Sequence, residues 1–370
     1  MSNQPEFDFL IVGAGMAGAS LAAELSAHAR VILIEAEDRP GYHATGRSAA
    51  FWTESYGGPQ VQPLTTASGP WLQDHGFLAP RGALTLAREE QADELDAFVQ
   101  GFRSAGVEVE TLDRDAIERR LPGVSPQWQL AAFEPDCCDI DVAGLHAHYL
   151  AALRKGGGQL RLRAPLVQAA RNGPGWRVEL ADGQVIRCET LVNAAGAWAD
   201  QVAQRAGIAP LGIQPMRRTV AQLRTAPAAS ASLPLVLDIG GDFYFKPENG
   251  RLWLSPHDET PSAACDAAPE EIDVALAIDR FQQVVDWRIE AVEHRWAGLR
   301  SFAPDRLPVY GRDSAEPQFA WFAGQGGFGI QTAPAAAMLA AAQLLERAQP
   351  DMLRDIDAGI YSPDRFAARI

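Results

Sequence analysis

Three glycines near the N-terminus have the spacing of a dinucleotide-binding turn. Gly13, Gly15 and Gly18 form the pattern GxGxxG between the apolar run Phe7–Val12 and a stretch with helical character. The first glycine permits a tight turn, the second lets the backbone approach a pyrophosphate, and the third allows the helix to pack closely on the strand. The N-terminus of the helix would then face the phosphates.

A carboxylate supports this interpretation. Glu35 lies near the end of a second apolar run, about 20 residues beyond the first glycine, where an acid binds a ribose 2′-hydroxyl. The alternative is a glycine-rich turn beside a surface glutamate, but it does not explain why strand, helix and acid occur together. An acid at this position disfavours the 2′-phosphate of NADP, so FAD and NAD remain.

A second glycine cluster favours FAD. The stretch "GQGGFGIQT", residues 324–332, directly precedes an apolar helical segment. A helix N-terminus there could stabilise the negative charge that reduced flavin carries near its N1–C2 edge. Glycines that only permit close helix packing are the alternative.

The bulk properties exclude several other classes. Net charge is −15, and the chain has no basic run that would hold nucleic acid or an anionic membrane. The four cysteines lack metal-ligand spacing and predict free thiols, and His146 and His148 lie too close in sequence to share a helix face. We therefore predict no metal site. The sequence has no apolar run of about 20 residues and no signal-peptide pattern, so we expect a cytoplasmic protein without a transmembrane segment.

The elements that must position these motifs are of two kinds. A strand–helix–strand unit opens the chain, helices are predicted over 89–106, 141–158 and 334–348, and hairpin turns at Asp182–Gly183 and Asn249–Gly250. We predict an α/β protein with a Rossmann-type FAD domain (1–52, 141–215 and 295–370) and a β-rich (α+β) substrate domain (53–140 and 216–294).

Five motifs in order carry a family resemblance. They are "FLIVGAGMAGASLA", "TGRSAA", "NAAGAW", "GLRSFAPDRLPVYG" and "GQGGFGIQT". Together they resemble the FAD-dependent D-amino acid oxidase superfamily, and most closely the D-arginine dehydrogenase type of D-amino acid dehydrogenase. The resemblance covers nearly the whole chain. It implies a D-amino acid oxidase-like fold, non-covalent FAD, and oxidative deamination of D-amino acids to 2-keto acids and ammonia.

The resemblance also implies a cofactor site. Ser48 and Ala49 would lie near the reactive N5 edge of the flavin, Thr45 and Arg47 toward its phosphate and ribityl side, and Val167 beside the adenine. With the glycine motifs, the expected cofactor-binding residues are Gly13, Ala14, Gly15, Met16, Ala17, Gly18, Glu35, Ala36, Thr45, Gly46, Arg47, Ser48, Ala49, Val167, Asn193, Ala194, Ala195, Gly196, Trp198, Gly298, Arg300, Gly324, Gly326, Gly327, Gly329, Ile330, Gln331 and Thr332.

A carboxylate-binding site is implied in the same way. Arg218, Arg300 and Tyr244 match residues that hold the substrate carboxylate, and guanidinium groups suit that task because they bind carboxylates bidentately. Tyr56 resembles a lid tyrosine. The remaining expected active-site residues, which would face substrate and flavin, are Gly327 and Gln331.

Two positions depart from the D-arginine type. Ala83 stands where that type has a glutamate, and Phe51 where it has a histidine. The pocket, lined further by Leu235, Leu237 and Trp52, would therefore favour neutral or apolar side chains over cationic ones, since a buried unpaired cation is unfavourable. Glu54 could restore a carboxylate from another direction.

Three alternatives stay open at this stage. The enzyme could oxidise a secondary amine, glycine or a 2-hydroxy acid; it could use nicotinamide alone; or the chain could be a non-catalytic flavin-binding subunit. The physiological electron acceptor is unknown. Lys155 and Lys246 are the only lysines, and the former lies far from every flavin motif, so we expect a dehydrogenase rather than an oxidase.

Overall fold

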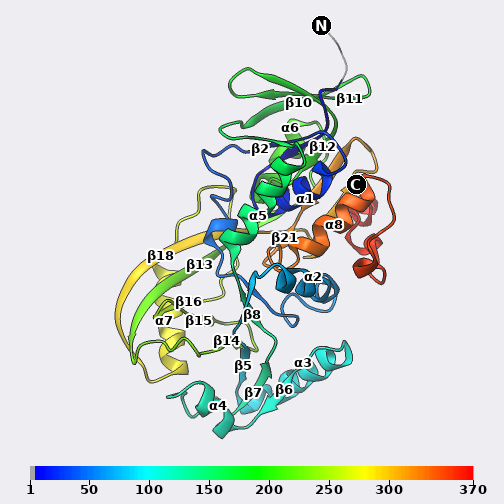
Figure 1. The fold of residues 1–370 in the computed structure, drawn as a ribbon. Coiled ribbons are helices and arrows are strands. Elements are labelled where there is room, and N and C mark those ends of the chain that lie inside the picture. The colour runs from blue at the N-terminus through cyan, green and yellow to red at the C-terminus, as the bar shows by residue number, and fades with distance from the viewer. Residues whose placement is uncertain (1–4, 370) are drawn as a thin grey trace.

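The computed structural model describes residues 5–369, which form two large sheets with helices against them (Figure 1). Strand β2 is apolar and buried throughout, and β1 is apolar apart from Asp8 and buried from Phe9 to Val12, as expected for parallel strands covered on both faces. The eight-stranded sheet has the order β10-β11-β12-β1-β2-β9, with β20 beside β12 and β19 beside β20. Its strands are β1 Phe7–Val12, β2 Val31–Ile34, β9 Gln159–Arg161, β10 Leu166–Asn172, β11 Gly175–Leu180, β12 Val185–Asn193, β19 Val309–Arg312 and β20 Phe319–Ala323.

Three helices form a layer beside this sheet. α1 (Met16–Ser26) contacts α5 (Val142–Lys155) and α8 (Ala333–Leu344), and their small and aliphatic side chains form one buried cluster. α6 (Ala199–Arg205) belongs to a second cluster that includes β10 and β11 residues. The parallel strands β1, β2 and β12 therefore end between packed helices.

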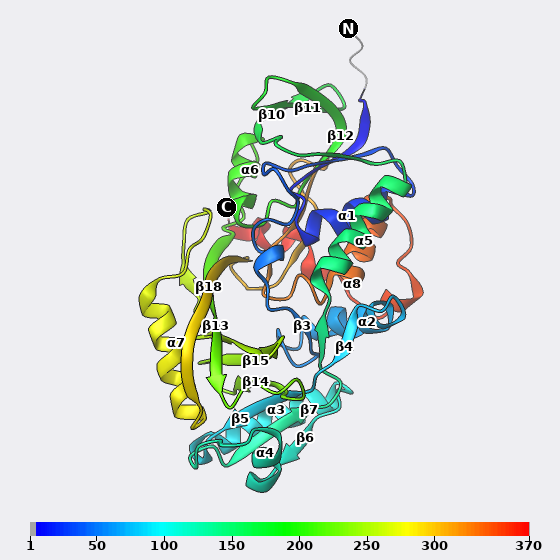
Figure 2. The same ribbon diagram turned by 60° about the vertical axis from the view of Figure 1, so that its left-hand side comes forward.

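The second sheet has ten strands, in the order β21-β18-β13-β16-β15-β14-β5-β7-β6, with β17 paired to β13. The helices α3, α4 and α7 lie against it (Figure 2). Its elements are β5 Ala83–Ala87, α3 Ala92–Ser104, β6 Glu110–Leu112, α4 Arg114–Arg120, β7 Leu130–Glu134, β13 Gln214–Ala226, β14 Leu235–Asp238, β15 Tyr244–Glu248, β16 Arg251–Ser255, β17 Thr260–Pro261, α7 Glu271–Val284, β18 Arg288–Phe302 and β21 Gln325–Gly326.

A small third sheet links these two parts. It contains β3 (Phe51–Trp52), β4 (Leu78–Pro80) and β8 (Cys138–Ile140), while α2 (Gln62–Asp74) packs on α8. Short 3₁₀ turns complete the chain: η1 Thr45–Arg47, η2 Glu89–Gln91, η3 Gly196–Trp198, η4 Asp351–Leu353, η5 Ala358–Tyr361 and η6 Pro363–Arg369.

The predicted α/β class is confirmed, as are the opening strand–helix–strand unit and both hairpins. Gly183 has φ +80°, and Asn249 and Gly250 have φ +50° and +74°, the left-handed conformations that tight hairpin turns require. The predicted domain ranges stay a prediction. β18 runs across the expected boundary at residue 295, and its partner β21 comes from the last predicted FAD-domain segment.

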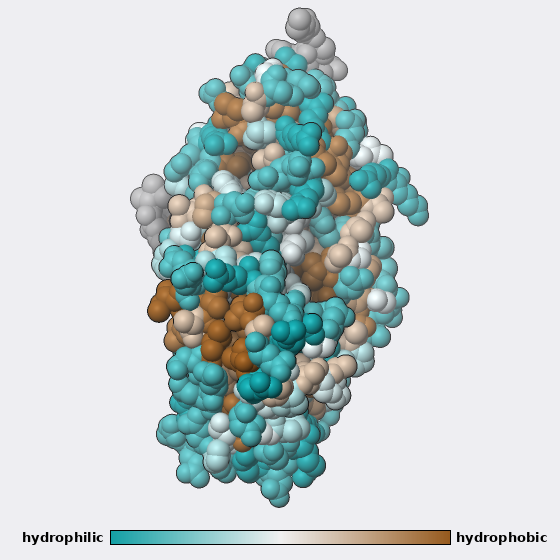
Figure 3. All heavy atoms as spheres, turned by 90° about the vertical axis from the view of Figure 1, so that its left-hand side faces the viewer, coloured by the Kyte–Doolittle hydropathy of each residue, from teal (hydrophilic) through white to brown (hydrophobic). Residues whose placement is uncertain are grey.

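One face of the molecule carries exposed apolar side chains (Figure 3). Ile272 and Leu276 of α7 and Val292 of β18 are exposed large hydrophobic residues. In residues 5–369, no helix is both long and apolar enough to cross a membrane.

Candidate active site

A cavity of about 350 Å³ runs between the carboxyl ends of β1, β2 and β12 and the face of the ten-stranded sheet. In open α/β sheets, ligands bind outside the carboxyl ends of the strands. Many of the predicted cofactor residues line it: Gly13, Gly15, Met16, Ala17, Glu35, Ala36, Thr45, Arg47, Ser48, Ala49, Ala194, Ala195, Gly196, Trp198, Gly298, Arg300, Gly326, Gly327, Gly329 and Ile330.

The first glycine turn is shaped as the spacing predicts. Gly13 has φ +100°, and a Cβ there would lie 2.6 Å from the Ala194 carbonyl oxygen. A Cβ on Gly18 would lie 1.8 Å from the carbonyl oxygen of Gly13, so strand and helix are in direct contact. No acidic residue stands in the first turn of α1. The turn and the helix end thus form a surface suited to phosphate.

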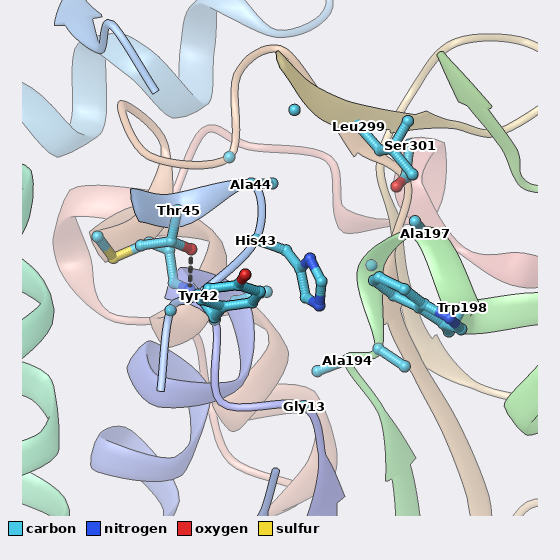
Figure 4. Close-up of a pocket in the computed structure, with 18 of the residues that line it drawn as sticks. Gly13, Tyr42, His43, Ala44, Thr45, Ala194, Ala197, Trp198, Leu299 and Ser301 are labelled. Carbon is cyan, nitrogen blue, oxygen red and sulfur yellow. Dashed lines mark hydrogen bonds between the residues drawn. The ribbon is translucent and has the colours of Figure 1, made fainter. Parts of the chain in front are cut away.

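Side chains brace this turn from two sides. The Ala14 amide donates to Glu35 Oε2 at 2.8 Å. The Met16 amide donates to Thr45 Oγ1 at 2.9 Å, the bond drawn as a dashed line at Thr45 in Figure 4. Glu35 Oε1 accepts from the Glu37 amide at 3.1 Å. Glu35 therefore stabilises the turn itself, a role that the sequence pattern did not indicate.

Aromatic side chains face each other across the same cavity. Figure 4 shows His43 and Trp198, which come from opposite walls, and their ring centroids are 4.6 Å apart. Five further lining residues were not among the site residues expected from the sequence: Tyr42, His43, Ala44, Leu299 and Ser301. These residues line the cavity because the chain passes along it between β2 and η1 and again along β18.

Arg47 binds the segment Cys265–Ala267, here called the strap, which lies along the cavity. Its Nη1 donates to the carbonyl oxygens of Ala267 and Ala297 at 2.9 and 3.1 Å, and its Nη2 pairs with Asp266. Cys265 and Ala267 of this strap are among the lining residues. The guanidinium is thus engaged by the strap, whereas the sequence resemblance directed it toward the phosphate and ribityl side.

Two guanidinium groups line the other end of the cavity, one buried (Arg218) and one partly buried (Arg300). Arg218 on β13 is 4% exposed; its Nε donates to the Asp258 carbonyl oxygen at 2.7 Å, and its Nη2 lies 3.3 Å from Glu259. Its Nη1 is buried without a hydrogen-bond partner. Arg300 donates to the Tyr56 hydroxyl at 2.6 Å and, within residues 5–369, has no carboxylate ion-pair partner. The site is therefore prepared for an anion.

The pKa shifts reflect this positive field. Burial lowers the pKa of Arg218, and the charge on Arg300 lowers it further. Burial raises the pKa of the Tyr56 phenol, but the two arginines outweigh it, so the pKa falls on balance. Burial, Arg218 and Arg300 lower the pKa of His257 to about 3, so this imidazole is neutral at physiological pH. His257 packs against Tyr244 and Tyr56 with ring centroids 5.6 and 6.3 Å away.

A much smaller cavity, of about 20 Å³, adjoins Arg300 and has room for little more than one water. Phe51, Tyr56, Tyr244 and Gln331 are among the residues that line it. Gln331 Nε2 donates to the Tyr56 carbonyl oxygen and to Thr65 Oγ1, while Gln331 Oε1 is buried without a partner. This orphan acceptor could receive an N–H of a ligand.

Glycine allows the arginine and the tyrosine to meet here. A Cβ on Gly327 would lie 2.8 Å from Arg300 Nη1 and 2.9 Å from the Tyr56 hydroxyl. The second glycine cluster therefore has a steric task at the anion site in addition to its place before α8.

The residues expected to form the side-chain pocket pack together as an apolar cluster, and their role in binding a side chain stays a prediction. Phe51, Ala83, Leu235 and Tyr244 are buried together, with Leu237 partly buried against them. Trp52 does not belong to it, because its indole donates to the Thr65 carbonyl oxygen and packs on α2. The Glu54 carboxylate accepts from the exposed Thr66 hydroxyl instead of facing this cluster.

Several predicted residues do not line either cavity. The Val167 side chain is 49% exposed, whereas its neighbour Leu166 lines the larger cavity. Asn193 is buried and donates to the Ala199 carbonyl oxygen. The other expected cofactor residues outside both cavities are Ala14, Gly18, Gly46, Gly324 and Thr332, and the expected pocket residues Ala83, Leu235 and Leu237 also line neither cavity. Lys246 is also buried elsewhere, with its ammonium 2.6 Å from Asp139.

Family comparison agrees with this geometry. Residues 8–343 match the family described as "DAO: FAD dependent oxidoreductase". The chain belongs to this family. It is an FAD-dependent oxidoreductase with a D-amino acid oxidase-like fold, and FAD is its cofactor. When bound, FAD would lie along the two glycine clusters and Glu35.

Relatives of this DAO family protein are distant. The bovine FAD-dependent oxidoreductase domain-containing protein 1 is 23% identical over 92% of this chain and 81% of its own. The chain spans about half the length of several other curated relatives that it matches. Glycine oxidase from Geobacillus kaustophilus has a similar structure (TM-score 0.82, 23% identity, 95% and 98% of the two chains), as does L-proline dehydrogenase from P. horikoshii (0.85, 19%, 99% of each).

Removing the carboxylate of Glu35 tests its bracing role in this family member. In Glu35→Gln, the charge-assisted bond from the Ala14 amide is weakened, and we expect the Kd for FAD to rise by about 10-fold or more. The measurement is fluorescence quenching as FAD is added back to the apoprotein. Glu189→Gln, an exposed change on strand β12 of the same sheet, is the control. Equal FAD affinity in both variants would contradict the role.

Proposed function

We propose that this oxidoreductase oxidises α-amino acids at the carbon beside the carboxylate, with D-amino acids of neutral side chain as the preferred class. The proposal rests on one observation above all: buried Arg218 and partly buried Arg300 line the same large cavity, and Arg218 Nη1 has no partner. An α-carboxylate would satisfy both guanidinium groups. The D configuration is supported by the sequence resemblance to D-amino acid dehydrogenases.

The side chains at the site suit this reaction. Arg218, Arg300 and Tyr244 would bind the carboxylate, and the Tyr56 hydroxyl would hold Arg300 in place through its 2.6 Å hydrogen bond. Gln331 Oε1 would accept an N–H of the amine. FAD supplies the hydride acceptor when bound. The substrate loses a hydride from Cα and a proton from nitrogen; water then converts the imino acid into a 2-keto acid and ammonia.

The small cavity favours a second candidate. Only about 20 Å³ is open beside Phe51 and Tyr244, which suits glycine or a compact secondary amine better than a large side chain. Glycine oxidase and L-proline dehydrogenase, two proteins of similar fold, carry names that agree with such substrates. We therefore rank small neutral D-amino acids first and glycine or cyclic and N-substituted amino acids second.

An anaerobic flavin-reduction screen tests the function and separates the candidates. The holoenzyme is mixed in turn with D-alanine, L-alanine, D-leucine, D-arginine, glycine, sarcosine and L-proline, and the loss of flavin absorbance is followed. We expect D-alanine to reduce the flavin fastest. Faster reduction by glycine, sarcosine or proline selects the second candidate, and a flavin that none of these compounds reduces would contradict both.

Removal of either guanidinium should impair substrate capture. A lost charge-assisted hydrogen bond costs on the order of 1.5–3 kcal/mol, so Arg218→Met and Arg300→Met should each lower kcat/KM by roughly 10- to 150-fold. Arg224→Met is the matched control, because Arg224 lies on the same strand as Arg218 but is half-exposed and pairs with Glu290 and Glu293. Control-like kinetics in both active-site variants would mean that the substrate binds elsewhere.

Phe51 should restrict the size of the side chain. Its ring fills the buried cluster with Ala83 and Tyr244, so Phe51→Ala should create room and raise kcat/KM for D-leucine relative to D-alanine. D-arginine should remain a poor substrate, because neither Ala83 nor Phe51 can pair with a cation. The measurement is the ratio of kcat/KM values for the three substrates. An unchanged D-leucine to D-alanine ratio would show that Phe51 does not limit the pocket.

We also propose that FAD is bound non-covalently and that electrons pass mainly to an acceptor other than oxygen, in the cytoplasm. The buried ion pair of Lys246 with Asp139 supports slow oxygen reactivity, since this lysine is engaged away from the cavities. Peroxide production as fast as turnover with an artificial acceptor would contradict the second point. Flavin that stays with acid-precipitated protein would contradict the first, with His43 and Cys265 as the lining residues to examine.

A further inference from the structure

Glu134 is a buried carboxylate beside the proposed substrate site, and it lines neither of the two cavities. It is the last residue of β7, is 3% exposed, and within residues 5–369 has no cationic ion-pair partner. Burial raises its pKa, although hydrogen bonds from Ser55, Thr53 and Glu54 oppose that shift. An ionisable group without a counter-charge is costly inside a protein, so its hydrogen bonds must account for its presence.

All of those hydrogen bonds come from three consecutive residues. Thr53 Oγ1 donates to Glu134 Oε2 at 2.6 Å, the Glu54 amide donates to Oε1 at 2.7 Å, and Ser55 Oγ also donates to Oε2. One carboxylate thus holds the whole turn that follows β3.

This turn joins two side chains of the proposed substrate site. Phe51 lies just before it, and Tyr56 directly after it. Tyr56 bonds through its hydroxyl to Arg300 and through its carbonyl oxygen to Gln331. A shift of the turn would therefore move the tyrosine that orients the arginine.

The strand pairing places Glu134 where it can act on this turn. Glu134 is the cross-strand partner of Ala83, whose side chain packs with Phe51 and Tyr244. Opposed residues of an antiparallel pair point to the same face of the sheet. The carboxylate of Glu134 therefore points to the same face of the sheet as Ala83, where it contacts the turn Thr53–Ser55.

We propose that Glu134 is a positioning residue that fixes Thr53–Ser55 and, through Tyr56, the substrate-binding geometry of Arg300. This inference rests on the proposed function in one respect, namely that Arg300 binds the substrate carboxylate. It assigns no contact between Glu134 and substrate.

A substitution series tests it. Glu134→Ala removes the acceptor of three donors and should raise KM by about 10-fold or more, with kcat changed by less than about threefold. Glu134→Gln keeps an oxygen for the Glu54 amide, and its NH₂ group can donate to the two hydroxyls, which can rotate to accept. It should recover most of the lost affinity. Equal KM values in wild type and a folded Glu134→Ala would overturn the proposal.

A matched control separates positioning from general stability. Asp200 also holds a short loop, because its carboxylate accepts from the amides of Leu211, Gly212 and Ile213 at 2.9–3.1 Å. Asp200→Asn should lower the melting temperature without changing KM. A KM increase in Asp200→Asn equal to that in Glu134→Ala would reduce the effect to loss of stability and contradict the proposal.

A double-mutant cycle tests whether Glu134 acts through Tyr56. Acetate serves as the probe, and its Kd is read from the perturbed flavin spectrum. Glu134→Ala should weaken acetate binding by about 10-fold in wild type but by less than about threefold in a Tyr56→Phe background. Full effects in both backgrounds would show that Glu134 does not act through Tyr56. If Glu134→Ala does not fold, the acetate Kd is compared in the two backgrounds with Glu134→Gln and Glu134→Asp instead.

The two hypotheses fail in different ways. If acetate does not perturb the flavin in wild type and no amino acid reduces it, the proposed function is wrong. If wild type binds acetate and the Glu134 variants bind it equally well, the function stands and the positioning role of Glu134 is wrong.

Discussion

The placement of two guanidinium groups, one buried and one partly buried, on one cavity is the constraint on which the rest of this structure depends. Like charges in a low-dielectric interior repel. Of the two arginines, only Arg218 lies within ion-pair distance of Asp258 and Glu259, while Arg300 donates to the Tyr56 phenol. Such an arrangement is stable only if the surrounding fold holds it firmly, because each cation would otherwise turn toward water or an acid. The long paired strands β13 and β18 supply that rigidity, since they carry the two arginines and pair along most of their length.

The same constraint explains how the two sheets share one ligand. The nucleotide end is built from turns after β1, β2 and β12, where glycine permits close approach. The substrate end is built from strands, on which side chains have fixed directions. Gly327 joins the two ends, since a larger residue would separate Arg300 from Tyr56. FAD bound along the glycine turns would thus lie next to the two arginines.

Short sequence patterns were enough to predict those elements whose structure depends only on neighbouring residues. The GxGxxG turn, the opening strands, α5, α8 and both hairpins depend on residues within one short stretch, and the structure has them. The family resemblance added Arg218, Arg300 and Tyr56. Arg300 lies 82 residues after Arg218 and 244 residues after Tyr56 in the sequence. It did not reveal Glu134, His257 or the strap at Cys265–Ala267. Their importance comes from contacts between distant segments, such as Glu134 with Thr53, and no spacing rule encodes these contacts.

The positive field of the two arginines also bears on how a substrate amine could lose its proton without help from a basic side chain of the protein. His257 shows the effect, because burial and the two arginines lower its pKa to about 3. A substrate amine bound in the same field would likewise lose affinity for its proton, since the cations disfavour a third positive charge nearby. We infer that the arginines that attract the carboxylate also favour the neutral amine, whose lone pair must be free for hydride to leave Cα. The proton can then pass to solvent before the substrate is enclosed, and Gln331 Oε1 needs only to accept a remaining N–H.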